Sequence, residues 1–470
     1  MIELKNISRI YFIGIGGIGM SALARYFNAK SVIVSGYDKT STVLTRQLEA
    51  EGISVQYEDS IELIDKEAQL IVYTPAIPKE HAGLNYFMAH GYKVVKRSDV
   101  LGAITNSSFN ICVAGTHGKT TTSSMVAHLL QHSGYGCNAF LGGIAVNYNS
   151  NFWLAPDNSE SSEKNVCVVE ADEYDRSFLK LSPDIAIITA MDPDHLDIYG
   201  TAENVEQAFI DFSARVKAGG SLIVKHGLKR SHEMKVADTC TYSATIENAN
   251  IHIENLQLNN GAYRFDVVNN YWGIENVELN MGGMHNVENV LAAIGVAKYL
   301  NIDNEKIKAA VSSYKGVKRR FEYIIAPSPS GEGRGEVVFI DDYAHHPDEL
   351  NALLSGAKNL FPEKKCTIIF QPHLYSRTKD FADGFAAALN RADEVFLLPI
   401  YPARELPMEG VNSEMIAAKM EEGKAVCCTK EELMAILDDR KLYNNAPDLL
   451  ITAGAGDIDT LVEPIKKMMN

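Results

Sequence analysis

The stretch VAGTHGKTTTSSM, residues 113–125, decides how the central part of the chain is interpreted. Gly115 lies three positions before Gly118, and Lys119 and Thr120 follow directly. The loop is therefore shorter than the usual G-x-x-x-x-G-K-[ST] pattern. The apolar run FNICVAG (109–115) precedes it, and the helical stretch KTTTSSMVAHLLQHSG, closed by Gly134, follows it. A strand, a glycine loop and a helix in this order favour a phosphate-binding loop.

In such a loop the lysine neutralises the β- and γ-phosphates of a nucleotide, and the hydroxyl of the next residue binds Mg²⁺. Lys119 and Thr120 fit these two roles. The alternative is a plain helix cap, because threonines are common at helix starts. The preceding strand and the glycines favour ATP binding through Gly115, Thr116, His117, Gly118, Lys119, Thr120 and Thr121.

Phosphoryl transfer also needs a metal held by hard ligands at the end of a neighbouring strand. Glu170 closes the apolar run VCVVE and fits this role. His195 follows the next predicted strand, in MDPDHLD, and together with Glu170 could bind a second metal ion. A lone histidine in this position could equally be a surface or capping residue. The candidate metal ligands are thus Thr120, Glu170 and His195.

A second glycine loop, GIGGIG, lies near the N-terminus between a predicted strand and a predicted helix. Gly14, Gly16 and Gly19 form the G-x-G-x-x-G pattern around Gly17, and Asp38 ends the next strand. Backbone N–H groups at a helix start hold a diphosphate in such loops. Three interpretations remain open for this motif alone: a dinucleotide site, a site for another diphosphate such as a UDP-sugar, or a structural turn.

Length and composition limit the class of protein. The 470 residues suggest about three domains, and 46% apolar and 22% charged residues are typical of a globular protein. The net charge of −16 argues against a nucleic-acid-coating surface. We see no membrane span and no signal-peptide layout. Seven cysteines without a C-x-x-C pair predict reduced, buried thiols in a cytoplasmic protein.

Strands and helices alternate in two regions, which favours parallel sheets covered on both faces. The first hundred residues contain RIYFIGIGG, SVIVSGYD, LIVYTPAIP and YKVVKRSD. Beyond Gly316 the runs VVFIDDY, CTIIFQPH, EVFLLPIY and DLLITAGAGD recur with helical stretches between them. Residues 240–280 predict a β-meander, and HNVENVLAAIGVAKYL predicts a helix. The segments 158–165 and 327–336 are polar and predict loops.

Eight motifs occur in an order that resembles the Mur ligases: GIGGIGMSALA, GTHGKTTT, EADEYDRSFL, DPDHLDIYG, GMHNVENVLAA, KGVKRRFE, DDYAHHPDEL and QPHLYSRTKDF. The short G-x-x-G-K-T loop is that family's form of the phosphate-binding loop. The resemblance implies an α/β fold of three domains. These would be an N-terminal Rossmann-like domain for UDP (1–107), a central ATP-binding P-loop domain (108–315) and a C-terminal Rossmann-like domain (316–470).

Within the family the motifs most resemble the branch that adds L-alanine to UDP-N-acetylmuramate in peptidoglycan precursor synthesis. The implied cofactors are ATP and Mg²⁺, and the implied partners are UDP-N-acetylmuramate and L-alanine, with no nucleic acid and no membrane. The γ-phosphoryl group of ATP would move to the lactyl carboxylate. The amine of L-alanine would then displace phosphate from this acyl phosphate. A carboxylate is a poor electrophile, so a leaving group must first be installed.

The resemblance also assigns residues. His285, Asn286 and Asn289 match the family's HN..N group near adenine, although helix capping and core packing would look alike. Arg320, Asp342 and Tyr343 match groups near the nucleotide, and ordinary strand-end turns are their alternative. The UDP-sugar site would comprise Gly14, Gly16, Gly17, Gly19, Asp38, His346 and His373. His345 and Arg377 would join the amino-acid end, where Arg377 could face the alanine carboxylate or be a solvated surface arginine. The catalytic set would be Lys119, Glu170, His195 and Arg377.

One departure concerns a lysine. Sister ligases carry a carbamylated lysine on the helix after the metal histidine, but TAENVEQAFIDFSARVK (201–217) has no lysine before Lys217, so we expect no carbamate. Three rival functions remain: a related ligase that attaches a recycled peptide, a nicotinamide oxidoreductase, and a nucleotide-binding protein without ligase activity. The oxidoreductase would leave Lys119 and Glu170 unexplained.

Overall fold

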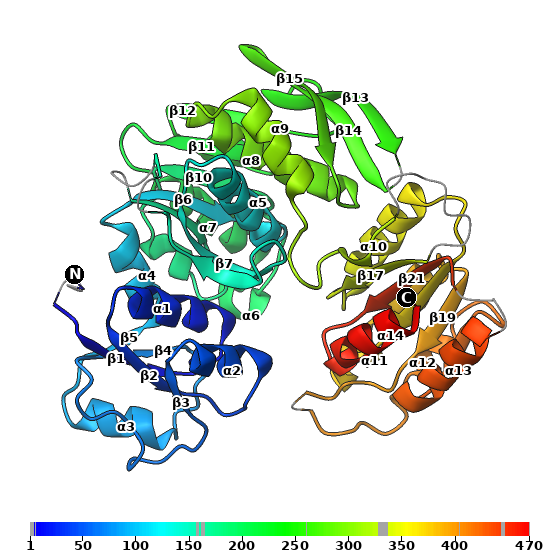
Figure 1. Cartoon of the computed structure of the whole chain (residues 1–470), viewed down its shortest axis with the longest axis horizontal. Helices are drawn as coiled ribbons and strands as arrows, with labels where there is room; N and C mark the ends of the chain where they lie inside the picture. Colours follow the sequence, from blue (N-terminus) through cyan, green and yellow to red (C-terminus); the bar gives the residue numbers. More distant parts are fainter. Residues whose placement is uncertain are drawn as a thin grey trace. The chain divides into compact units, whose positions relative to one another are not determined.

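The computed structural model describes residue 4 and residues 6–156, 159–160, 165–259, 261–327, 337–403, 405–442 and 447–469. Most of the predicted loops 158–165 and 327–336 therefore lies outside the described residues. The chain forms two compact units. The first comprises Met1–Ile253, Val267–Gly273 and Glu288–Ala310, and the second comprises Glu254–Asp266, Ile274–Val287 and Val311–Asn470. Three β-sheets with helices confirm the α/β class (Figure 1).

The N-terminal sheet has the strand order β3-β2-β1-β4-β5, and its strands are parallel. Its strands are β1 (Arg9–Ile13), β2 (Ile33–Tyr37), β3 (Ser54–Gln56), β4 (Leu70–Tyr73) and β5 (Val94–Lys96). Its helices are α1 (Ile18–Ala29), α2 (Val43–Ala50), α3 (Ala82–Ala89) and α4 (Arg97–Thr105). The four predicted strands are confirmed, and the short β3 is an addition.

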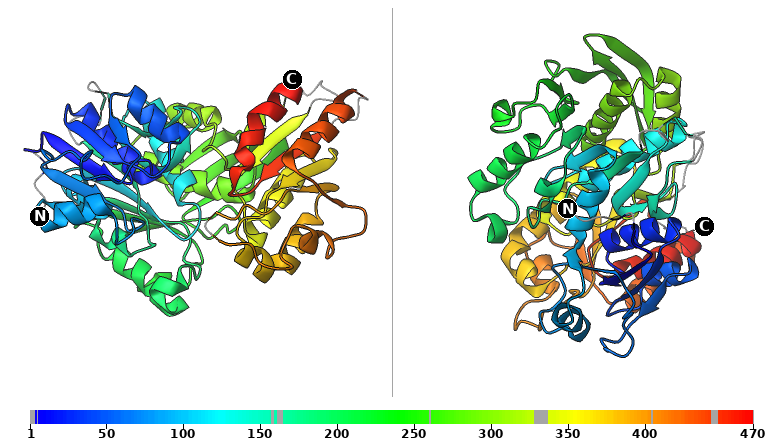
Figure 2. Two further views of the ribbon diagram at one scale, coloured as in Figure 1. Left: turned by 90° about the horizontal axis from the view of Figure 1, so that it is seen from below. Right: turned by 90° about the vertical axis from the view of Figure 1, so that its left-hand side faces the viewer.

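Alternate residues of β1 enter different hydrophobic clusters. Ile10 and Phe12 join α1, α2 and α4 on one face of the sheet, whereas Tyr11 and Ile13 pack with α3 on the other. Figures 1 and 2 show helices on both faces of this sheet. Side chains of a strand alternate between its faces, so a continuous apolar run requires both faces to be covered.

The central sheet has the order β15-β14-β13-β12-β11-β10-β6-β9-β7-β8. Its strands are β6 (Phe109–Ala114), β7 (Asn138–Ala145), β8 (Ser150–Trp153), β9 (Val166–Glu170), β10 (Ile185–Ile188), β11 (Ser221–Lys225), β12 (Asp238–Tyr242), β13 (Ile251–Asn259), β14 (Ala262–Asn269) and β15 (Trp272–Leu279). Its helices are α5 (Lys119–His132), α6 (Leu196–Tyr199), α7 (Ala202–Ser213), α8 (Met284–Tyr299) and α9 (Asn304–Ser313). The prediction of a β-meander over 240–280 holds for β13, β14 and β15, which are consecutive along the chain and neighbours in the sheet. Strand β12 instead pairs parallel with β11 and β13, and residues 243–250 form no strand.

The hairpin of β7 and β8 is the feature of this sheet that the sequence analysis does not predict. The two strands pair antiparallel at the edge, and β7 pairs parallel with β9. Helix α1 of the N-terminal sheet packs against both strands. One hydrophobic cluster accordingly runs from Phe12 and Phe27 to Phe140, Phe152 and Val169, across the N-terminal and central sheets.

The C-terminal sheet has the order β16-β17-β21-β18-β19-β20, with β16 antiparallel to β17 and the other pairs parallel. Its strands are β16 (Glu322–Ile325), β17 (Val338–Asp342), β18 (Cys366–Phe370), β19 (Glu394–Leu397), β20 (Ala425–Cys427) and β21 (Leu449–Ala453). Its helices are α10 (Pro347–Leu360), α11 (Tyr375–Leu389), α12 (Glu414–Ala417), α13 (Lys430–Leu442) and α14 (Val462–Met469). The four strands predicted beyond Gly316 are confirmed. Among the described residues, no helix has the length and apolar character needed to cross a membrane.

Candidate functional site

The N-terminal glycine loop follows β1. In the sheet β1 lies between β2 and β4, so the strand order changes direction at this point. Ligands of open α/β sheets bind at such switch points. The backbone N–H of Gly16 donates to Oδ2 of Asp38 at 2.8 Å, so the predicted partner of the loop does lie against it. Helix α1 begins directly after Gly17 and has no acidic residue in its first turn. Its N-terminal N–H groups thus provide a partial positive charge.

The second glycine loop connects β6 to α5, as the sequence predicts. Gly115 has a φ of 143°, and a Cβ there would lie 2.0 Å from Oγ1 of Thr189 at the end of β10. Only glycine permits this close approach. The backbone N–H of Asp192 donates to Oγ1 of Thr116 at 3.1 Å. Thr121 is buried and His117 is exposed.

Lys119 begins α5 and donates from Nζ to the carbonyl oxygen of Gly115 at 2.6 Å. It also forms an ion pair with Glu173, at 2.8 Å from Oε1. Glu173 is almost completely buried, and its Oε2 has no hydrogen-bond partner among the described residues. Burial raises the pKa of Glu173, and the ammonium group of Lys119 opposes that rise. Glu173 was not predicted from the sequence, although it belongs to the same EADE run as Glu170.

Thr120 and Glu170 meet as predicted. Oγ1 of Thr120 donates to Oε1 of Glu170 at 3.0 Å, and the backbone N–H of Gly142 on β7 donates to Oε2 at 2.9 Å. The carboxylate is therefore held at both oxygens, from α5 and from β7. A hydroxyl and a carboxylate oxygen are the ligand types that Mg²⁺ prefers, and Mg²⁺ completes its octahedron with water and substrate phosphates.

His195 lies directly before α6 with a φ of 52°. Its Nε2 is 3.8 Å from Oε1 of Glu173, and its ring packs edge-on against Tyr174 with centroids 5.0 Å apart. Glu173 thus lies between Lys119 and His195. In the described part of the chain, no three His, Cys, Asp or Glu side chains are grouped to hold a metal ion. The residues present can supply part of a coordination shell only.

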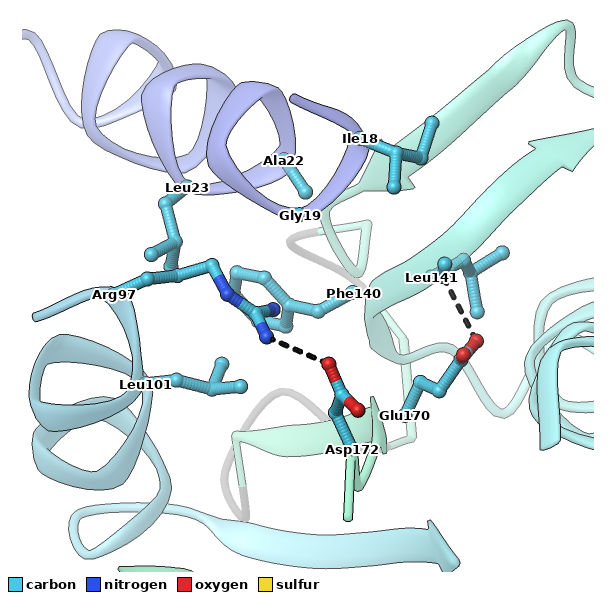
Figure 3. A pocket seen from close by; sticks show the side chains of 11 residues that line it. Ile18, Gly19, Ala22, Leu23, Arg97, Leu101, Phe140, Leu141, Glu170 and Asp172 are labelled. Atoms are coloured by element: carbon cyan, nitrogen blue, oxygen red, sulfur yellow. Dashed lines mark hydrogen bonds and ion pairs between the residues drawn. The ribbon is translucent and has the colours of Figure 1, made fainter. Parts of the chain in front are cut away.

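A cavity of about 160 Å³ extends from the first turn of α1 to Glu170 (Figure 3). Its walls include Gly19 from α1, Arg97 from α4, Gly142 from β7, Glu170 from β9 and Asp172. Arg97 and Asp172 point toward one another across it, with Nη2 3.2 Å from Oδ2. A Cβ at position 19 would lie 2.5 Å from Nη1 of Arg97, so the guanidinium lies directly against the start of α1. The N-terminus of α1 and the guanidinium of Arg97 are both positive and lie at the same end of the cavity, which favours an anionic ligand there.

Helix α8 carries the predicted HN..N residues His285, Asn286 and Asn289. Oδ1 of Asn289 accepts a hydrogen bond from Thr122 of α5 at 3.1 Å, so Asn289 lies beside the phosphate-binding helix. Nδ2 of Asn286 donates to the carbonyl oxygen of Gly282 at 2.6 Å. A Cβ at Gly283 would lie 2.4 Å from the ring of His285.

The second compact unit holds the predicted nucleotide residues near the end of β17. Asp342 accepts hydrogen bonds from the backbone N–H groups of Phe321 at 2.6 Å and Ala344 at 2.7 Å. Burial raises its pKa to about 6. Tyr343 is partly exposed and lies under the guanidinium of Arg319, 5.1 Å from its ring centroid. Arg320 is exposed.

Asp341 is a buried carboxyl group that was not predicted from the sequence. It accepts a hydrogen bond from Oγ1 of Thr452 at 2.6 Å and lies 3.4 Å from Nε of Arg319. Burial raises its pKa to about 7. Its position as the first acid of DDY could have suggested it.

Four further predicted residues follow two strands of the C-terminal sheet: His345 and His346 come after β17, and His373 and Arg377 come after β18. The rings of His345 and His373 lie 6.2 Å apart, and burial lowers the pKa of both, with a further contribution from Arg377. In the part of the chain described, Nδ1 of His373 and Nη1 of Arg377 are buried without a hydrogen-bond partner. His346 instead caps α10, since the backbone N–H of Asp348 donates to its Nδ1 at 3.4 Å.

Three family models cover most of the chain. The model described as "Mur ligase family, catalytic domain" matches residues 9–109. "Mur ligase middle domain" matches residues 113–297. "Mur ligase, glutamate ligase domain" matches residues 319–456. The three matches follow one another along the chain. The first and third contain all strands of the N-terminal and C-terminal sheets, and the second contains the central sheet except residues 109–112 of β6.

Similar proteins have comparable length. The UDP-N-acetylmuramate–L-alanine ligase of Parabacteroides distasonis is 45% identical, over 99% of this chain and 98% of its own. A crystal structure of UDP-N-acetylmuramate-alanine ligase from Thermotoga maritima is 28% identical with a TM-score of 0.79, over 98% of both chains. A murein peptide ligase from Psychrobacter arcticus shares the fold at 21% identity, with a TM-score of 0.67 over 98% of both chains. The chain therefore belongs to the Mur ligase family.

Proposed function

We propose that this chain is the ATP-dependent ligase that joins L-alanine to the lactyl carboxylate of UDP-N-acetylmuramate in peptidoglycan synthesis. The relative that is 45% identical over nearly the whole chain bears the name of this activity. ADP and phosphate are the other products. The substrates and ATP are small and polar, and we place the reaction in the cytoplasm, where ATP is available.

The observation that carries the proposal is the cavity between Gly19 and Glu170. One end meets the start of α1, where N–H groups and Arg97 suit an anion. The other end meets the carboxylate that Thr120 and Gly142 hold. A sugar nucleotide bound by its diphosphate at the first end would direct its carboxylate toward the second. The cavity thus leads from the proposed sugar-nucleotide loop to the proposed phosphoryl-transfer site.

The chemistry requires two anions to approach each other, and cationic groups lower the cost of that approach. Lys119 would stabilise the charge on the transferring phosphoryl group. Thr120 and Glu170 would hold Mg²⁺, which supplies charge neutralisation at the phosphates when bound. Glu173 would orient Lys119 and His195, since both lie near its Oε1. His195 would contribute a further ligand or a contact to substrate.

We assign the nucleotide to Asn289 of the first compact unit, which lies beside the phosphate-binding helix, and to His285, Asn286, Arg320, Asp342 and Tyr343 of the second unit. We assign the amino-acid end to Arg377 and His345, and the sugar end to His346 and His373. Nη1 of Arg377 has no hydrogen-bond partner among the residues that the structure describes, which supports its assignment to a carboxylate. The domain boundaries we propose remain 1–107, 108–315 and 316–470.

Phosphate release tests the proposal. The assay contains ATP, Mg²⁺ and UDP-N-acetylmuramate, and each amino acid or peptide is added in turn. Release that needs both UDP-N-acetylmuramate and L-alanine is expected. Release only with a tripeptide would assign the chain to peptide recycling, since the shared fold does not separate the two activities. No release with any pair would contradict a ligase, and nicotinamide binding to the Gly14–Gly19 loop would then be measured.

A further inference from the structure

Asn151 is a fully buried polar residue on β8, outside the cavity and outside every predicted site. Its amide nitrogen donates to the carbonyl oxygen of Ile18 at 2.5 Å and to Oγ of Ser21 at 3.0 Å. Its amide oxygen accepts from Nη1 of Arg25 at 2.5 Å. All three partners belong to α1. A single side chain of the central sheet therefore binds the first two turns of the helix that follows the glycine loop.

Arg25 extends this connection to the rest of the N-terminal sheet. Its side chain is 8% exposed, and its Nε and Nη2 both lie 2.8 Å from carboxylate oxygens of Glu51, which follows α2. A buried cation must be paired, and here the carboxylate and the amide oxygen of Asn151 share that task. Hydrogen bonds thus run from the end of α2 through α1 to β8.

The apolar side chains between α1 and the β7–β8 hairpin cannot by themselves fix the position of the helix along the hairpin. Tyr26 packs on Phe140 at 5.4 Å and on Phe152 at 6.2 Å between ring centroids. Such contacts are non-directional, because their free energy follows the area buried. Hydrogen bonds require defined distances and angles. Asn151 is therefore the group in this contact that sets the position of α1 along the hairpin.

The other strand of the hairpin reaches the phosphoryl-transfer end of the cavity. Gly142 on β7 donates its N–H to Glu170, and Ile18 and Gly142 are both cavity walls. One hairpin therefore holds both ends of the cavity: Asn151 holds the first turn of α1, and Gly142 holds the carboxylate. A shift of α1 would change the distance that a bound sugar nucleotide must span.

We infer that Asn151 is a positioning residue for the sugar nucleotide, which sets the diphosphate-binding turn of α1 relative to Glu170. This inference rests on the proposed function. It predicts that loss of the amide weakens binding of UDP-N-acetylmuramate while binding of ATP stays normal, because the phosphate-binding loop on α5 does not depend on this contact.

The experiment compares Asn151→Ala and Ser21→Ala with Ser150→Ala as the matched control. Ser150 lies on the same strand, and among the described residues its side chain bonds only to the backbone of Phe152. Since each lost hydrogen bond is worth about a factor of two to ten, Asn151→Ala should raise the KM for UDP-N-acetylmuramate about tenfold and Ser21→Ala about threefold. The KM for ATP should stay within about twofold in both variants, and kcat should change less than the KM for the sugar nucleotide.

Each result has one meaning. A wild-type enzyme without UDP-N-acetylmuramate-dependent phosphate release contradicts the proposed function, and the inference with it. An active wild type with an unchanged sugar-nucleotide KM in Asn151→Ala overturns the inference alone. Equal rises in the KM values for ATP and sugar nucleotide would indicate general loosening and also overturn it. If Asn151→Ala fails to fold, Ser21→Ala decides between these outcomes, because it removes one hydroxyl and leaves Asn151 bound to Ile18 and Arg25.

Discussion

Lys119 and Glu173 form an ion pair with Nζ 2.8 Å from Oε1, and their side chains are 15% and 2% exposed. Two charges taken out of water remain tolerable only while they are paired. The pair joins the phosphate-binding loop to the segment that follows β9. Glu173 thus holds the ammonium group of Lys119, and in the proposed reaction the same group stabilises the transferring phosphoryl group.

Lys119→Ala should lower kcat at least about 100-fold, because it removes charge stabilisation of the transferring phosphoryl group. It should also lower the melting temperature, since Glu173 loses its partner in a buried position. The double variant Lys119→Ala/Glu173→Gln should regain melting temperature but not activity. Phosphate release and thermal unfolding provide the two measurements. A folded Lys119→Ala enzyme with a near-normal rate would refute the assignment of the loop.

Arg97→Met and Asp172→Asn should act in opposite directions on the KM for UDP-N-acetylmuramate. Removal of the guanidinium should raise this KM about tenfold, the size expected for a lost charged hydrogen bond. Removal of the carboxylate leaves Arg97 without its competing partner and should lower the KM a few-fold. Lys419→Met, which breaks an exposed ion pair with Asp383, is the control. Effects of equal sign in the two variants would show that the ion pair matters only for structure.

Arg377→Ala should raise the KM for L-alanine more than the KM for ATP. Its Nη1 is buried and unpartnered in the described part of the chain, and a guanidinium in that state suits a carboxylate ligand. Lys379→Ala, an exposed residue on the same helix, should leave both constants unchanged. Initial rates at varied L-alanine and varied ATP give the comparison. An unchanged L-alanine KM would remove Arg377 from the amino-acid site.

Asp341 should make stability depend on pH. Its pKa is raised from 3.8 to about 7 in the folded protein, so the folded state holds this proton more tightly than the unfolded state between those values. By linkage the free energy of unfolding then falls as pH rises through that window. Asp341→Asn removes this contribution and keeps an acceptor for Thr452.

The measurement is the melting temperature of wild type and Asp341→Asn at pH 5 and pH 8. The difference between variant and wild type should shift in favour of the variant as pH rises. Comparing the two proteins cancels the opposite contribution of His345 and His373, whose pKa values burial lowers. Asp348→Asn, whose side chain is 93% exposed, should show no such trend. A constant difference across the two pH values would disprove the role of Asp341.

Much of the fold follows from local sequence. Apolar runs that end in glycine or acidic residues predicted β1, β6, β9, β17 and β21 because buried parallel strands need such runs. The hairpin of β7 and β8 was missed, since NAFLGGIA contains two glycines and lacks the alternation of a half-buried strand. Its glycines serve the site instead: Gly142 brings its N–H to Glu170.

The site was predicted in parts for a related reason. Strand ends and glycine loops identified Thr120 and Glu170, which do meet. Contacts between distant segments, such as Arg97 with Asp172 or Asn151 with α1, have no local sequence signal, because 75 and 130 residues separate the partners. The proximity of His195 to Glu173 was not predicted from the sequence, because the turn after β10 sets the direction of the His195 side chain.

The hydrophobic cluster that runs from Phe12 to Val169 has a consequence for how the chain loses its structure on heating. Elements that share one core unfold as one cooperative block. Calorimetry should accordingly resolve fewer transitions than there are sheets, with the first two sheets melting together. A fragment that stops at residue 107 would leave Tyr26 without its ring partners Phe140 and Phe152 on the central sheet, and it should aggregate. A chimera that exchanges the first sheet between family members would therefore also have to exchange β7 and β8, because α1 packs against these strands.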